Sequence, residues 1–183
     1  MSINVSSVLT NMQPEQKGGS RPGKCIVAIE QVQAREALGR SKGGFSTKIH
    51  LRCDGNGLPI VLLLTGGERH ETVVFELLLE QGTVKRLGAG RPRLRPHRVV
   101  GDKGYSSGTI RRYLRRRGIR LTIPRKSNEK HRGKFDKSIY QTRNVVERCF
   151  NRLKQFRRIA TRYEKKVENY QAMLTLASIL LWL

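Results

Sequence analysis

The sequence STKIHLRCDGNGLPIVLLLT, residues 46–65, predicts two strands joined by a tight turn. Apolar and polar residues alternate from Ser46 to Cys53, which is typical of a half-buried strand. The DGNG sequence of Asp54–Gly57 favours a hairpin turn, since Asp-Gly and Asn-Gly both tolerate positive φ. We therefore expect the apolar run Leu58–Thr65 to pair antiparallel with the preceding strand and to be buried in the centre of a sheet.

Regular elements are expected on both sides of this hairpin, in an order that predicts an α/β fold. Before it, Ile3–Thr10 predicts a strand and Pro14–Gly23 a loop. After it, apolar residues at helical spacing predict a helix over Thr72–Leu87. The remaining elements are expected in this order: a basic loop Gly88–Pro96, a buried strand Arg98–Asp102, a helix Gly108–Arg117 capped by Ser106 or Ser107 and closed by Gly118, a strand Ile119–Pro124, a polar loop Arg125–Lys134, a helix from Asp136 or Ser138 to about Ile159, and a helix Val167–Leu183.

The charge of the chain points to a polyanionic partner. Its 183 residues include 37 Lys and Arg against 14 Asp and Glu, a formal net charge of +23. This excess is larger than solubility requires, and nucleic acid is the first candidate. A membrane surface is the weaker alternative, because no apolar stretch approaches the roughly 20 residues of a spanning helix. The length suits one domain with a hydrophobic core.

The cysteines and the first residues indicate a protein that stays in the cytoplasm. Cys25, Cys53 and Cys149 are odd in number and far apart, so they give neither a disulfide framework nor a C-x-x-C zinc or redox motif. Residues 1–13 lack the basic start, apolar run and cleavage site of an export signal. We expect a cytoplasmic, nucleoid-associated protein.

Four polar residues share one side of the helix predicted after residue 136. Tyr140, Arg143, Glu147 and Lys154 are three, four and seven residues apart, which places them within an arc of about 60° on an ideal helix. Two interpretations fit this row: side chains that face a cleft, or an ordinary Arg–Glu–Lys ladder on a solvated face. The apolar residues of the same helix form a separate stripe that can pack on a core: Val146, Cys149, Phe150, Leu153 and Phe156.

The spacing Tyr140-x2-Arg143-x3-Glu147-x6-Lys154 resembles the signature of the DDE transposases of the insertion-sequence-four/five superfamily, in particular its insertion-sequence-five-like members. The resemblance covers almost the whole chain. It implies a ribonuclease-H-like fold, in which two Asp and one Glu hold two Mg²⁺ ions that activate water or a DNA 3′-hydroxyl against a phosphodiester. The further blocks that carry it are Gly39–His50, Leu64–Gly67 with His70, Gly101–Tyr105 and Asn151–Tyr163.

The resemblance also implies roles for individual residues. Asp102, at a predicted strand end, corresponds to the second acid and Glu147 to the third, so both are the expected catalytic and metal-binding residues, with Mg²⁺ or Mn²⁺ as cofactor. Val5 stands where the family has its first Asp, and valine cannot coordinate a hard cation. The residues that correspond to DNA-phosphate contacts are Tyr140, Arg143 and Lys154.

Other charged residues receive weaker assignments. Asp54 belongs to the hairpin turn and is expected to be structural, and His70 is left out of the site because a lone His is more often a surface residue. The arginines of residues 111–117 suggest contacts with the DNA backbone, with a solvated basic face as the alternative. The same applies to a second series, Arg148, Arg152, Arg157, Arg158 and Arg162.

The resemblance divides the chain into an N-terminal remnant, residues 1–38, with a strand and a polar loop, and a catalytic domain, residues 39–183. The expected fold is a ribonuclease-H-like mixed sheet flanked by helices, with an incomplete or degenerate N-terminal strand region in an N-terminally truncated transposase. The expected function is Mg²⁺-dependent cleavage and strand transfer at element ends, by a homo-oligomer on DNA with no membrane partner. Two alternatives stay open: a catalytically inactive DNA-binding fragment, because of Val5, and a basic RNA-binding protein, against which the Gly101–Tyr105 block argues.

Overall fold

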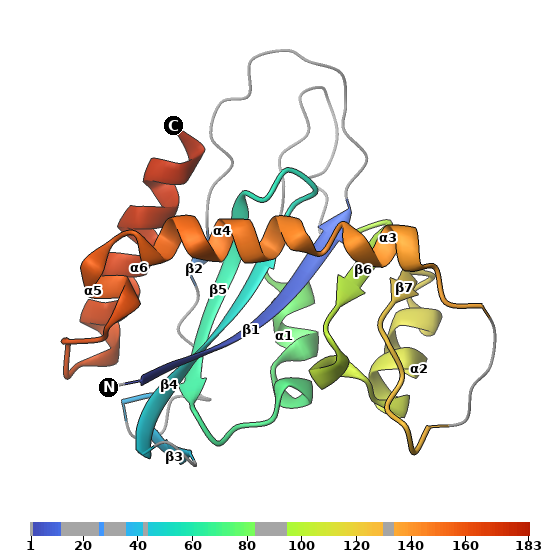
Figure 1. Cartoon of the computed structure of the whole chain (residues 1–183), viewed down its shortest axis with the longest axis horizontal. Helices are drawn as coiled ribbons and strands as arrows, with labels where there is room; N and C mark the ends of the chain where they lie inside the picture. The colour runs from blue at the N-terminus through green and yellow to red at the C-terminus, as the bar shows by residue number, and fades with distance from the viewer. Residues whose placement is uncertain (1, 12–25, 28–35, 42–43, 83–94, 130–133) are drawn as a thin grey trace.

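One mixed sheet forms the centre of the computed structural model, which describes residues 2–11, 26–27, 36–41, 44–82, 95–129 and 134–183 (Figure 1). Its strand order is β2-β5-β4-β1-β6-β7, and β3 pairs with β4 outside this path. β4 is antiparallel to β5 and parallel to β1, whereas β1 is antiparallel to β6 and β6 is parallel to β7. The strands are β1 (Ser2–Asn11), β2 (Ile26–Val27), β3 (Gly39–Ser41), β4 (Gly44–Cys53), β5 (Pro59–Gly66), β6 (Arg98–Gly101) and β7 (Arg120–Thr122).

Helices cover both faces of this sheet. Leu62 of β5 packs into a core with the helices α4, α5 and α6, while its neighbour Leu63 packs into a second core with α1 and α2. This confirms the expected α/β class with a mixed sheet between helices. None of the described helices is long and apolar enough to cross a bilayer. They are the 3₁₀ helices η1 (Glu71–Val73) and η2 (Lys103–Tyr105), and the α-helices α1 (Phe75–Glu80), α2 (Gly108–Arg116), α3 (Lys137–Gln141), α4 (Asn144–Lys154), α5 (Arg157–Ala160) and α6 (Val167–Trp182).

The predicted hairpin is confirmed in detail. Asp54 N donates to Leu58 O over 3.0 Å and Gly57 N to Asp54 O over 3.2 Å, and Gly57 has φ +83°, which favours glycine. Asp54 Oδ1 accepts from Asn56 N at 3.0 Å and Leu58 N at 2.8 Å. Asp54 therefore has the structural role that the turn sequence predicts.

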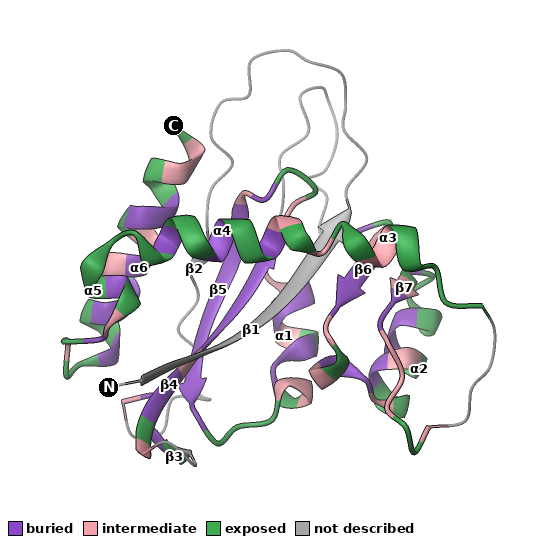
Figure 2. Ribbon diagram, viewed as in Figure 1, coloured by how far each residue is buried: buried purple, intermediate pink, exposed green. Residues whose placement is uncertain are grey.

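The prediction that β4 is half-buried is wrong, because both faces of the strand are covered (Figure 2). Most of its polar side chains are buried: Ser46, Thr47, His50 and Arg52. Thr47 Oγ1 donates to Ala37 O over 2.9 Å, and Arg52 Nη1 donates to Leu78 O, Leu79 O and Gln81 O over 3.2, 3.2 and 2.7 Å. Alternation on this strand thus separates two buried faces, and Arg52 on one face and Thr47 on the other find partners in the layers that cover them.

The predicted helix over residues 72–87 is shorter in the structure. η1 and α1 occupy residues 71–80, and Gln81 already has extended backbone (φ −89°, ψ 164°). Gly82 follows with φ +77°, a conformation that ends helices, and Arg52 binds the last carbonyls of α1. Residues 83–94, which include most of the predicted basic loop, lie outside the described part.

The single long helix predicted up to Ile159 is divided into α3, α4 and α5. Asp136 caps α3, with its carboxylate accepting from Ile139 N over 3.0 Å, so the first of the two predicted starts is confirmed. Arg143 N and Val146 N each donate three residues back instead of four, which tightens the chain between α3 and α4. A second break comes at Phe156, where φ −76° and ψ 109° are extended.

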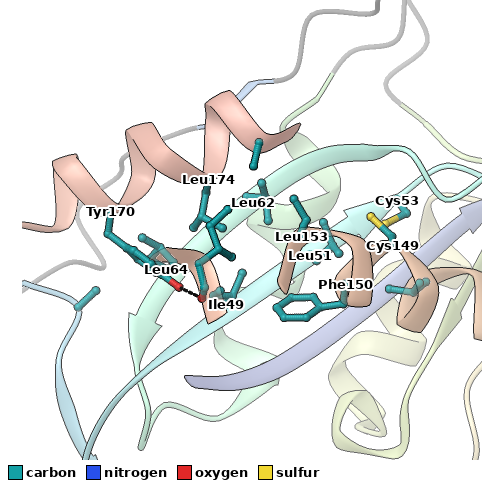
Figure 3. Close-up of a cluster of buried hydrophobic side chains, with 14 of the residues drawn as sticks. Ile49, Leu51, Cys53, Leu62, Leu64, Cys149, Phe150, Leu153, Tyr170 and Leu174 are labelled. Carbon is teal, nitrogen blue, oxygen red and sulfur yellow. Dashed lines mark hydrogen bonds between the residues drawn. The ribbon is translucent and has the colours of Figure 1, made fainter. Parts of the chain in front are cut away.

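The apolar stripe of α4 packs as predicted at all positions but the last (Figure 3). Phe156 is 36% exposed because the extended backbone at that residue turns it out of the helix. The buried members are Val146, Cys149, Phe150 and Leu153. Cys149 faces Cys53 of β4, both as free buried thiols, in line with the expectation for these two cysteines (Figure 3). Cys25 lies outside the described residues.

The remaining elements agree with the sequence pattern. β6, α2, β7 and α6 occupy the predicted positions, with α2 capped by Ser107, whose Oγ accepts from Thr109 N over 3.2 Å. Gly118 closes that helix with φ +61°. Ile3–Thr10 lies within β1, as predicted.

His50 is a buried ionisable group in the middle of β4. Its Nε2 lies 2.9 Å from Thr65 Oγ1 on β5, and the side chain is inaccessible to solvent. Burial, and to a smaller extent the Lys48 ammonium, lowers the pKa of His50 from 6.5 to about 3, although Glu71 opposes the shift. The imidazole is therefore neutral in the folded protein at neutral pH.

The stability of the protein should fall as the pH is lowered from about 6.5 toward about 3. In this interval the unfolded chain binds a proton on residue 50 that the folded chain does not bind, and above it neither state does. At pH 5 the expected loss relative to pH 7 is about 2 kcal/mol from this residue. Urea unfolding of the parent and His50→Gln at both pH values measures it. An unchanged pH dependence in His50→Gln would contradict this assignment.

Candidate functional site

Asp102 lies at the carboxyl end of β6, at the point where the strand stops. Its backbone is extended (φ −76°, ψ 168°) and its Oδ1 accepts a hydrogen bond from Gly104 N, so Asp102 caps η2. Tyr105, at the end of η2, is fully buried and its ring centroid lies 5.5 Å from that of Phe75. This buried ring anchors the turn, and Asp102 beside it is partly buried at the strand end.

A second carboxylate, Glu71 of η1, lies close to Asp102. A Cβ built on Gly104 would lie 3.2 Å from both Asp102 Oδ1 and Glu71 Cδ, so a glycine at this position lets the two acids approach. Lys48 Nζ donates to Glu71 Oε1 over 3.1 Å. Burial alone would raise the pKa of Glu71, but its own backbone amide and Lys48 outweigh burial and lower it.

Glu71 was not predicted from the sequence as a neighbour of the site. The signal that could have indicated it is its place directly after His70, in the block that carries the resemblance. His70 itself has a 52% exposed side chain, and its Nδ1 accepts from Thr72 N at the start of η1. His70 Nδ1 also lies 3.8 Å from Glu71 Oε2, so the exposed imidazole is a neighbour of the second carboxylate.

The structure brings together three of the four residues of the predicted polar row. Arg143 Nη2 donates to Glu147 Oε1, and the Arg143 guanidinium lies 5.6 Å from the centroid of the Tyr140 ring. Lys154 is in the last turn of α4, where its Nζ lies 5.3 Å from the Phe150 ring. Glu147 is 51% exposed at its side chain and is not among the residues of α4 that pack in the core.

The first acid of the implied triad falls at Val5, in the middle of β1. Val5 pairs with Ile49 of β4, and three residues further along β1, Val8 pairs with Gly101, the residue before Asp102. Position 5 thus lies on the strand beside β6. Within the described residues there is no group of three or more His, Cys, Asp or Glu that could hold a metal ion.

Several arginines that the sequence suggested for DNA contacts form hydrogen bonds within the protein, although Arg152 remains exposed. Arg111 Nη2 donates to Ser106 Oγ and Ile123 O, over 2.9 and 3.2 Å. Arg162 is 2% exposed and Arg152 donates to Gly57 O over 3.1 Å. The exposed arginines of α2 and the residue after it are Arg112, Arg115, Arg116 and Arg117.

A mixed sheet between two helical layers, an acid at a strand end and a large excess of arginine define a basic α/β domain. Residues 22–182 of this domain match the family model described as the transposase DDE domain. The chain therefore belongs to the DDE transposase family, which confirms the resemblance at that level.

Two relatives are described as transposases of insertion sequence elements. A Burkholderia cepacia protein, described as a transposase for insertion sequence element IS402, is 33% identical over 135 residues, 74% of this chain. A Brucella ovis protein, described as a transposase for insertion sequence element IS6501, is 28% identical over 140 residues, 75% of this chain and 98% of that protein. The match spans only 62% of the Burkholderia relative. No solved structure matches the chain.

The Arg143–Glu147 pair is expected to contribute little to stability. It is an i,i+4 ion pair with a half-exposed carboxylate, and such pairs are worth about 0.5 kcal/mol. A double-mutant cycle with Arg143→Gln and Glu147→Gln, followed by urea unfolding, should give a coupling energy of that size. A coupling above about 1.5 kcal/mol would favour a structural ladder as the reason for these residues.

Proposed function

We propose that this chain is the DNA-binding, ribonuclease-H-like domain of an insertion-sequence transposase of the four/five superfamily, with one acid too few for a complete metal site. The observation that carries the proposal is the family match over residues 22–182. The net charge of +23 supports DNA as the partner, at element ends and target, because neutralising backbone phosphates releases counterions and favours binding. Family membership also favours DNA over RNA.

Tyr140, Arg143 and Lys154 are the proposed phosphate contacts of the α3–α4 segment. A planar guanidinium can bind two phosphate oxygens at once, and the contacts of Arg143 with Tyr140 and Glu147 fix its orientation. Lys154 adds a compact positive charge about three turns beyond Arg143, at the end of α4. Together they would hold the backbone of one DNA strand along the exposed side of the helix.

The metal-dependent step is proposed to be incomplete. Two Mg²⁺ ions held by three carboxylates stabilise the attacking and leaving oxygens of a phosphodiester. Asp102 and Glu147 are the proposed ligands for Mg²⁺ or Mn²⁺, and carboxylate oxygens are the donors that these ions prefer. Val5 offers no such donor, so we infer DNA binding without efficient cleavage. A fully active transposase is the alternative that the experiment below distinguishes.

The organisation of the protein is part of the same proposal. Residues 39–183 are proposed to form the ribonuclease-H-like domain together with β1, which lies between β4 and β6 in the same sheet. The active assembly is proposed to be a homo-oligomer on paired DNA ends, located with the nucleoid. These features follow from the family resemblance and from the charge of the chain.

Restoring the missing acid should restore Mg²⁺-dependent nicking of a supercoiled plasmid. The parent chain is expected to nick no faster than a metal-free control, and Val5→Asp to nick at least about tenfold faster, because a third carboxylate completes the metal site. Adding Glu147→Ala to Val5→Asp should remove the gain. Val8→Asp, on the same strand, is the matched control and should not nick.

Two outcomes would contradict the proposal. Robust nicking by the parent that depends on Glu147 would show a complete catalytic site despite Val5. No nicking by Val5→Asp, in a protein that still binds DNA, would show that the first acid does not belong at position 5.

A further inference from the structure

A hollow beside Asp102 lies outside the group formed by α3 and α4. Its lining comes from two segments that are far apart in the sequence, η2 and the turn that follows β7. The lining residues are Lys103, Gly104, Lys126, Ser127 and Asn128. The side chains of this lining determine the kind of ligand that the hollow can bind.

The turn that supplies Lys126 is held in place by Glu129. Glu129 N donates to Lys126 O over 3.0 Å, which closes the turn. The Glu129 carboxylate accepts from Ser106 Oγ at 2.8 and 2.9 Å, and Ser106 is only 3% exposed. Arg111 Nη2 lies 3.4 Å from the same carboxylate and also donates to Ser106 Oγ. This network ties the turn to α2, so the position of Lys126 is largely preset.

The opposite wall is equally anchored. Tyr105 N donates to Asp102 O over 3.1 Å and Ser106 N to Lys103 O over 3.0 Å. The ring of Tyr105 is buried in the core between the sheet and α2. The backbone of Lys103 is thus fixed next to Asp102, and both walls are preorganised without a ligand.

The chemistry of the hollow suits an anion. Glu129 is already balanced by Arg111 and by Arg125, whose Nη1 lies 3.9 Å away. Among the residues that the structure describes, neither Lys103 nor Lys126 forms a salt bridge. Two ammonium groups, with a hydroxyl and a side-chain amide beside them, are donors that match the oxygens of a phosphate.

We propose that this hollow binds a backbone phosphate of DNA that runs past Asp102. The inference rests on the proposed DNA binding and adds a contact separate from Tyr140, Arg143 and Lys154. The lysines would offset the repulsion between the phosphate and the neighbouring Asp102 carboxylate.

The test compares two double variants with the same loss of charge. One is Lys103→Gln with Lys126→Gln; the matched control is Lys165→Gln with Lys166→Gln, two exposed lysines before α6. Binding to a duplex of about 30 base pairs is followed by fluorescence anisotropy from about 50 to about 200 mM KCl. The first variant should bind about tenfold more weakly and lower the salt slope by about 1, whereas the control should keep the parent slope.

The outcomes separate this inference from the proposed function. A parent chain that does not bind DNA contradicts the proposed function itself. Parent binding with an equal loss in both double variants overturns the hollow as a site, because net charge alone would then explain the effect. Thermal unfolding of each variant verifies that the fold is retained.

The Glu129→Gln variant gives a second test, because general electrostatics and the preset turn predict opposite changes in DNA affinity. Removing a negative charge should strengthen DNA binding if only general electrostatics matter. If the preset turn is needed, the variant should bind several-fold more weakly, because its carboxylate no longer fixes the turn to Ser106 and Arg111. Tighter binding by Glu129→Gln would overturn the inference.

Discussion

The fold depends on how the polar side chains of β4 are satisfied once the strand is buried on both faces. On one face Arg52 donates to three carbonyls at the end of α1 and so fixes the length and position of that helix. On the other, Arg162 Nη1 donates to Thr47 Oγ1 over 2.7 Å and to Glu36 O over 2.9 Å, and its guanidinium lies over the ring of Tyr170 in α6. Leaving such buried groups without partners would cost several kcal/mol in total, so each helical layer is tied to the strand that it covers.

The residues that pack in the core are different from the residues of the candidate site. The inner side of α4 is held by apolar contacts with β4 and β5, which leaves Arg143 and Glu147 on its outer side. On the other side of the sheet, the buried ring of Tyr105 fixes the turn after β6, where Asp102 is only partly buried. The candidate site therefore consists of side chains that the core does not need.

Local patterns predicted much of the fold, and the errors arose where partners lie far away in the sequence. The Asp54–Gly57 turn and the Ser107 cap depend on residues within one turn, so the sequence contains all that is needed. The burial of β4 could not be predicted, since a polar residue such as Arg52 is buried only because α1 presents carbonyls to it. The breaks on either side of α4 were not predicted, because the apolar residues keep their helical spacing through both of them. Glu71 and the Ser106–Glu129 contact were missed for the same reason as Arg52: they join elements that only the tertiary fold brings together.

The central claim is that this chain has the frame of a DDE transposase domain but lacks one carboxylate of its metal site. Binding of Mn²⁺, followed through the electron paramagnetic resonance signal of the free ion, tests it most directly, because the readout does not depend on DNA or on turnover. Val5→Asp should bind Mn²⁺ at least about tenfold more tightly than the parent, and Glu147→Gln in that background should remove the difference. Parent binding as tight as that of Val5→Asp would contradict the claim.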